Sequence, residues 1–92
     1  MSTINVVESH QKSVEEIKSG LSQFEEMFKK YGVKVAWSGA NAALSGPVSG
    51  EININDSTLK VTIKLGMMAK MAGIDGARLE SSIRKRLRVA LD

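Results

Sequence analysis

The alternation of apolar and polar residues along Val48–Leu65 constrains the fold more than any other feature of this chain. Apolar residues and a glycine share one parity along 48–55, and the same rhythm resumes along 58–65. A period of two residues is typical of strands that bury one face and expose the other. Because the polar pair Asp56 and Ser57 separates the two runs, the sequence predicts an antiparallel hairpin that lies on a hydrophobic core.

Three further strands are predicted from shorter patterns. Residues 33–38 alternate around Val35 and Trp37, residues 41–46 follow a turn signal, and residues 4–9 are rich in β-branched side chains. We predict that the first two of these strands join the hairpin in an antiparallel meander, and that 4–9 is an edge strand.

An amphipathic helix is predicted over 13–31. Ser13 and Glu16 have the spacing of a capping box, and Gly32 is placed to end the helix in a left-handed conformation. The apolar stripe of this helix comprises Val14, Ile17, Leu21, Phe24, Phe28 and Tyr31.

A second amphipathic helix is predicted over 75–91, after a short helical segment at 67–72 that stops at Gly73. Its apolar stripe comprises Leu79, Ile83, Leu87, Ala90 and Leu91. The order of elements is therefore βαββββα. We predict a single α+β domain over residues 1–92, in which an antiparallel sheet of four to five strands packs on two helices. The buried sheet face is expected to carry Val35, Trp37, Ile52, Ile54, Val61 and Ile63.

The sequence shows no recognisable catalytic or metal-binding pattern. His10 is the sole histidine, and its neighbour Ser9 would point to the opposite face of a strand, which argues against a Ser–His–acid triad. We expect His10 to bond a backbone carbonyl at a strand end. The pairs Glu15–Glu16 and Glu25–Glu26 fit a solvated helix face, and the glycines match no nucleotide-binding motif. No catalytic residue, metal or cofactor is predicted.

Composition predicts the compartment. The chain has no cysteine, so it forms neither a disulfide nor a thiolate zinc site. No apolar run reaches the roughly 20 residues that span a bilayer, and the N-terminus lacks the pattern of a signal peptide. We therefore expect a soluble, cytoplasmic protein without a membrane span.

Charge is distributed unevenly along the chain. Residues 1–56 hold five basic and seven acidic residues, whereas residues 57–92 hold eight basic and three acidic residues. The basic end can contact phosphates, acidic proteins or an anionic surface, or it can form a solvated helix face. The methionines that precede it can touch an apolar surface or fill gaps in the core. The candidate contact residues are Met67, Met68, Met71, Arg78, Arg84, Lys85 and Arg88.

Three short motifs have a pattern in common with a known family. They are Trp-x-Gly at 37–39, Gly-x-Val-x-Gly at 46–50 and Leu-Gly at 65–66, before a terminal helix. The chain thereby resembles the putative polyhydroxyalkanoic acid system protein family over nearly its whole length, although its Met-rich segment 67–71 departs from the family pattern. The resemblance implies a bacterial protein, encoded near the genes of polyhydroxyalkanoate storage granules, with an accessory role there. It implies no active site, and the residues that carry over as fold-defining positions are Trp37, Gly39, Gly50, Leu65 and Gly66.

Three functions follow as hypotheses. The first is a non-enzymatic accessory protein that binds a storage-granule surface, or a granule protein, through the candidate contact residues. The second is a binding or catalytic domain that holds an apolar small molecule between the sheet and the final helix, using His10 or Trp37. Nucleic-acid binding is disfavoured, because single-strand binders present stacking aromatic residues that this chain lacks outside its core. An unpaired outer strand allows a homodimer through sheet extension.

Substitution of Ile63 by Asp tests which sheet face is buried. We expect Ile63→Asp to abolish cooperative thermal unfolding, because an unpaired carboxylate in the core costs several kcal/mol. Lys64→Asp should unfold like the native chain. Circular dichroism during heating measures both variants, and equal loss of the transition in both would mean that the opposite face is buried.

Overall fold

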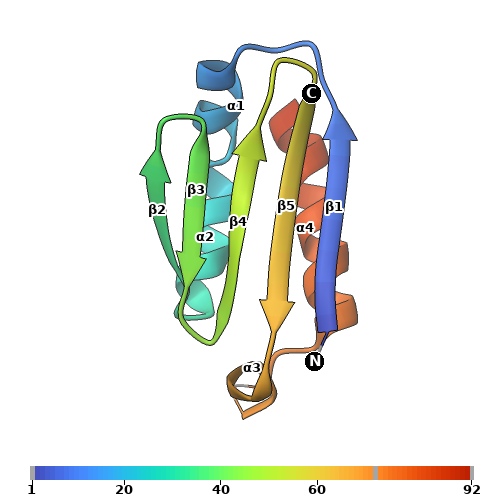
Figure 1. Cartoon of the computed structure of the whole chain (residues 1–92). Helices are drawn as coiled ribbons and strands as arrows, with labels where there is room; N and C mark the ends of the chain where they lie inside the picture. Colours follow the sequence, from blue (N-terminus) through green and yellow to red (C-terminus); the bar gives the residue numbers. More distant parts are fainter. Residues whose placement is uncertain (1, 72, 92) are drawn as a thin grey trace.

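Five antiparallel strands form one layer of the structure, and the helices form a second layer on one face of it (Figure 1). This computed structural model describes residues 2–71 and 73–91, without the side chains of Ser2, Met68 and Ala69. The strands are β1 (Ser2–Ser9), β2 (Lys34–Ser38), β3 (Asn41–Ser45), β4 (Val48–Ile54) and β5 (Thr58–Leu65). The helices are α1 (Val14–Gly20), α2 (Ser22–Lys30), α3 (Met67–Met71) and α4 (Gly76–Leu91).

The sheet has the strand order β1-β5-β4-β3-β2, so the first strand pairs with the last and the other four form a meander. The predicted α+β fold and the predicted edge position of the first strand are confirmed. The register pairs Ile63 with Ile4 and Val61 with both Val6 and Ile52, which places these apolar residues on one face. The predicted core residues Ile52, Ile54, Val61 and Ile63 are all buried.

The helices cover the apolar face in two groups. Figure 1 shows α1 and α2 behind β2, β3 and β4, and α4 behind β5 and β1. The stripe of α4 is buried as predicted at Leu79, Ile83, Leu87 and Ala90, and Leu91 is half-buried. All four buried residues belong to the same hydrophobic cluster as the inner face of the sheet.

The predicted helix 13–31 is divided, and this is the main correction to the sequence analysis. The capping box of Ser13 and Glu16 is present, but α1 ends at Gly20 and α2 begins at Ser22. Glycine has a weak helix propensity, and here it also meets α4: a Cβ on Gly20 would lie 2.9 Å from the carbonyl oxygen of Ala90. The interruption therefore lies where the first helical group passes closest to α4.

Tyr31 was predicted on the buried stripe, and this is wrong. Tyr31 follows the last residue of α2 and is 37 % exposed. Gly32, which has φ 76, then turns the chain into β2 as expected. The chain thus leaves the helix before the tyrosine side chain can reach the core.

Gly50 permits a close approach of β4 and β5 that the sequence pattern did not predict. A Cβ at this position would collide with the carbonyl of Thr62 and lie 3.0 Å from the Ile63 Cα. Glycine in a strand interior commonly marks such an approach of another backbone.

Replacement of Gly50 by alanine should destabilise the protein by at least about 2 kcal/mol, because neighbouring backbone would have to move. Gly66→Ala is the matched control, since a Cβ there meets nothing within 4 Å. Urea unfolding followed by circular dichroism measures both variants. Equal midpoints for the two would contradict the close approach at Gly50.

Candidate functional site

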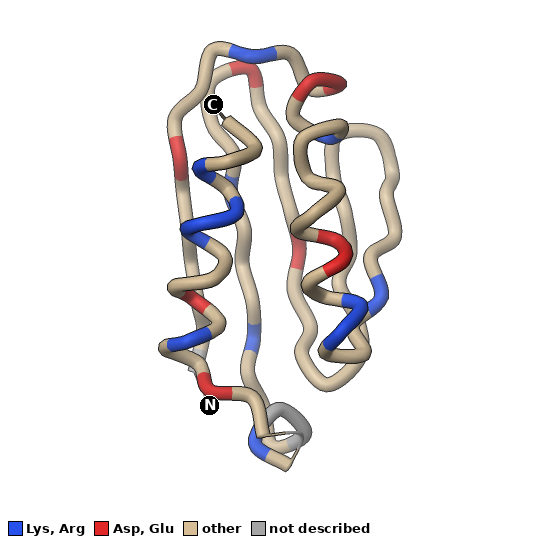
Figure 2. Tube along the Cα trace, turned by 180° about the vertical axis from the view of Figure 1, so that it is seen from behind, with Lys and Arg blue, Asp and Glu red and all other residues tan. Residues whose placement is uncertain are grey.

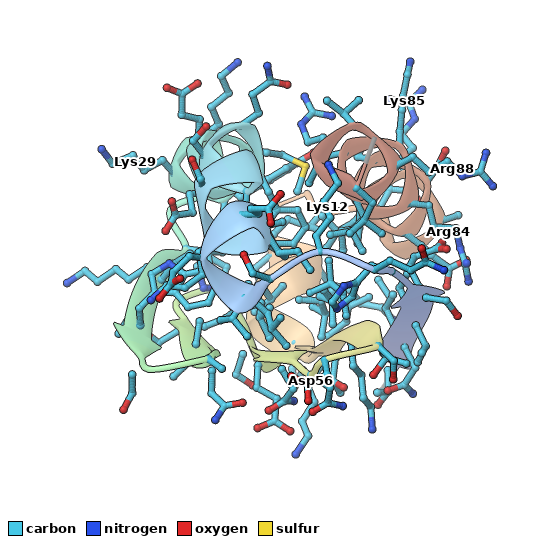
Figure 3. All side chains as sticks on the ribbon, turned by 90° about the horizontal axis from the view of Figure 1, so that it is seen from above. Lys12, Lys29, Asp56, Arg84, Lys85 and Arg88 are labelled. Carbon is cyan, nitrogen blue, oxygen red and sulfur yellow. The ribbon has the colours of Figure 1, made fainter. Side chains whose placement is uncertain are left out.

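Helix α4 carries a row of exposed cations on its outer side. Asp75 starts the helix by accepting hydrogen bonds at Oδ1 from the N–H groups of Ala77 (2.9 Å) and Arg78 (3.4 Å). Because the apolar stripe faces the sheet, the basic residues must face outward. Figure 3 shows Lys85 extending away from the sheet, and Arg84 and Arg88 extending sideways on the β1 side. The four predicted cations are all exposed: Arg78, Arg84, Lys85 and Arg88.

Few of these cations are neutralised within the chain. Arg84 Nε lies 3.8 Å from Glu80 Oε2, and both side chains are almost half exposed. An exposed pair of this kind contributes little to stability. The structure shows no ion pair between the other three cations of the row and the described residues, so the α4 row remains strongly positive (Figure 2).

Helix α3 presents methionine to solvent at one end of the molecule. Gly66 precedes the helix, and α3 protrudes beyond the end of the sheet (Figure 1). Met67 and Met71, one turn apart, are 80 % and 84 % exposed. These two side chains do not fill gaps in the core, which was the alternative interpretation. The predicted contact by Met68 lies outside the described residues, because its side chain is not described.

The exposed methionines and the exposed cations lie on two helices that follow each other along the chain. Only residues 72–75 separate α3 from α4, so Arg78 lies in the helical turn next to α3. The cations then continue along α4 from Arg78 to Arg88, over about 15 Å of the helix. We refer to the described residues of this set as the α3–α4 surface: Met67, Met71, Arg78, Arg84, Lys85 and Arg88.

Both ring nitrogens of His10 are hydrogen-bonded to backbone groups. It is 9 % exposed, its Nδ1 accepts a hydrogen bond from the N–H of Lys12 (3.1 Å), and its Nε2 lies 3.2 Å from the Thr58 carbonyl. Since the carbonyl only accepts, Nε2 carries the proton and donates. The expectation of a histidine bonded to a backbone carbonyl at a strand end is confirmed.

Trp37 lies on β2, at the opposite edge of the sheet from β1 and His10. Its Nε1 donates to Glu25 Oε1 (2.6 Å), and Lys18 Nζ lies 4.9 Å from its ring centre. Lys18 Nζ also donates to the Gly39 carbonyl (3.0 Å). The structure does not bring His10 and Trp37 together, so they cannot serve one common pocket.

Two open hollows lie away from α4. One, of about 580 Å³, lies between α2 and β2, and a smaller one, of about 300 Å³, lies on the outer face of the sheet. The side chains between the sheet and α4, such as Ile83, Leu87 and Val61, are fully buried. The sequence analysis treated Glu25 and Glu26 as a solvated face and missed the first hollow. Helical spacing places Ser22, Glu25, Glu26 and Lys29 on one side of α2, where they line this hollow together. That spacing could have indicated the hollow from the sequence.

The described residues contain no group of three or more histidine or acidic side chains that could hold a metal ion. Within that part of the chain, no helix is long and apolar enough to cross a membrane. Phe24 and Phe28 pack edge to face in the core, with ring centres 4.7 Å apart, and so are not offered to nucleic acid bases.

Fold and surface together define a small two-layer α+β protein whose apolar and cationic side chains gather on an exposed helical surface. The chain belongs to the putative polyhydroxyalkanoic acid system protein family, whose model matches residues 4–91. The resemblance recognised in the sequence is thus confirmed. No curated protein and no solved structure matched the chain.

Replacement of His10 tests its role as a link between β1 and β5. We expect His10→Ala to lower the free energy of unfolding by about 1–3 kcal/mol, because the backbone groups of Lys12 and Thr58 lose a buried partner. His10→Gln, whose amide can both donate and accept, should recover part of this loss. Urea unfolding measures all three proteins, and an Ala variant as stable as the native chain would contradict the role.

Proposed function

We propose that this protein is a non-enzymatic, cytoplasmic accessory protein of polyhydroxyalkanoate granules, and that it contacts the granule or a granule protein through the α3–α4 surface. The observation that carries the proposal is the exposure of Met67 and Met71 beside a row of cations. Family membership supports the granule as the place of action.

The methionines and the cations of the α3–α4 surface would contribute to binding in different ways. Burying a side chain of this size against an apolar surface contributes about 1.5–3 kcal/mol, and methionine adapts to irregular surfaces. The cations add attraction to anionic groups, which weakens beyond about 10 Å at 0.1 M salt. We therefore expect the charges to speed association with the surface, and burial of the methionines to stabilise the bound state.

Co-sedimentation with purified granules tests the proposal. We expect the native chain to enrich in the granule fraction. Met67→Ser with Met71→Ser, and separately Ser at Arg78, Arg84, Lys85 and Arg88, should each weaken binding by about tenfold or more. Added salt should weaken binding of the native chain but hardly affect the variant that lacks these four cations.

Matched controls come from the outer face of the sheet, which lies on the opposite side of the molecule. Val7 is an apolar side chain that is 56 % exposed there, so Val7→Ser changes exposed apolar area without touching the α3–α4 surface. Lys60→Ser with Lys64→Ser removes two cations from the same face. Absence of the native chain from the granule fraction, or equal losses in controls and test variants, would refute the proposal.

A further inference from the structure

The face of the sheet that the helices cover is fully buried at one edge and only partly buried at the other. At the β1 edge, Ile4 and Val6 are buried under α4. At the β2 edge, Val35 and Trp37 point to the same face but are only half-buried. The predicted core position of these two residues is therefore only partly realised, because β2 is the outermost strand on this side of the described sheet.

The open groove of about 580 Å³ lies at this edge. Its lining comprises Ser22, Glu25, Glu26 and Lys29 from α2, with Val33 just before β2 and Lys34 and Val35 at the start of β2. The α2 residues recur at three- and four-residue steps and so form one flank of the helix. Figure 3 shows Lys29 extending from α2 on the side away from α4. The groove therefore combines Val33 and Val35 with charged side chains from α2 and with Lys34 from β2.

The backbone of β2 is available for pairing at the same residues. Ser38 and Asn41 flank a two-residue turn in which Gly39 has φ 63. In a turn of this kind the carbonyl of the first residue, Ser38, accepts a hydrogen bond from the N–H of the fourth residue, Asn41. The backbone groups of Ser38 therefore face β3. Alternation along an antiparallel strand then directs the backbone groups of Val35 and Trp37 toward the open edge.

The acidic and basic residues on the α2 flank are placed so that the flanks of two copies of the chain can pair opposite charges. The hydrogen bond from Trp37 places Glu25 near the end of β2, and the bond from Val33 N–H to the Phe28 carbonyl (2.9 Å) places Lys29 near its start. A twofold rotation about the middle of β2 reverses the order of the acidic and basic residues in the second copy. The acidic half of one flank then faces the basic end of the other.

We propose that the groove and the open edge of β2 form the interface of a homodimer, in which two copies of β2 pair antiparallel. The twofold axis passes through Ala36, so Val35 of one copy pairs with Trp37 of the second copy. Glu26 of each copy faces Lys29 of the other. The two sheets become one sheet of ten strands, and the half-buried side chains of both copies cover each other.

The β1 edge is the poorer site for a second copy. Its inner side chains are already buried, so pairing there would cover little additional apolar surface. Figure 3 also shows Arg84 and Arg88 of α4 extending on the β1 side, where two copies would bring like charges together.

Analytical ultracentrifugation of the full chain tests the proposal. The short β2 edge predicts a small interface, and we expect a monomer–dimer equilibrium with a dissociation constant in the micromolar range. Lys29→Glu and Glu26→Lys should each weaken dimerisation about tenfold, because each change places like charges together twice. The double variant should restore the native constant, and Lys30→Glu, an equal change on an exposed residue outside the groove, should leave it unaltered.

Tryptophan fluorescence gives an independent readout, because Trp37 is the sole tryptophan and lies at the proposed interface. Its emission should shift to the blue as concentration rises, with the same midpoint as the sedimentation data. A chain that stays monomeric at all concentrations would overturn the proposal, even if the groove then binds a peptide from another protein. A dimer insensitive to Lys29→Glu, as expected for pairing through β1, or one that the double variant does not restore, would also overturn it.

Discussion

One-sided burial of the sheet is the interaction on which the rest of this structure depends. The inner side chains of β4, β5 and β1 form one cluster with the apolar stripes of α1, α2 and α4. Because side chains alternate between faces, a slip of one residue in any pairing would move the entire inner set into solvent. Burial of the apolar side chains therefore fixes the register of the strands. Because the apolar stripes of the helices pack on the same face of the sheet, their polar side chains remain exposed.

The parts of the fold that follow from periodicity could be predicted from the sequence. Alternation located the strands, and the capping box and the left-handed Gly32 located the ends of the first helical region. The interruption at Gly20 and the tight approach at Gly50 could not be predicted in this way. Both arise where segments distant in sequence pass close together, and a single glycine in a pattern does not say which segment it meets.

The candidate site was predictable to a similar extent. Helical spacing placed the cations on the outer side of α4, because burial of the apolar stripe leaves them no other position. The exposure of Met67 and Met71 could not be inferred, since methionine suits a core gap and a surface equally well. The groove beside β2 was missed because the predicted meander does not say how much of this outer strand the neighbouring helix leaves uncovered.

The position of α1, α2 and α4 on the same side of the sheet has a consequence for avidity. Antiparallel pairing of two edge strands keeps the equivalent faces of two sheets on the same side, so a dimer through β2 would display both copies of α4 toward one target. Once one copy of a dimer has bound an extended surface, the second copy is held near that surface at a high effective concentration. Two weak contacts can together give an avidity about 10²–10⁴ times higher than the affinity of either contact alone. Retention on a large particle could then respond sharply to protein abundance, although neither contact is strong alone.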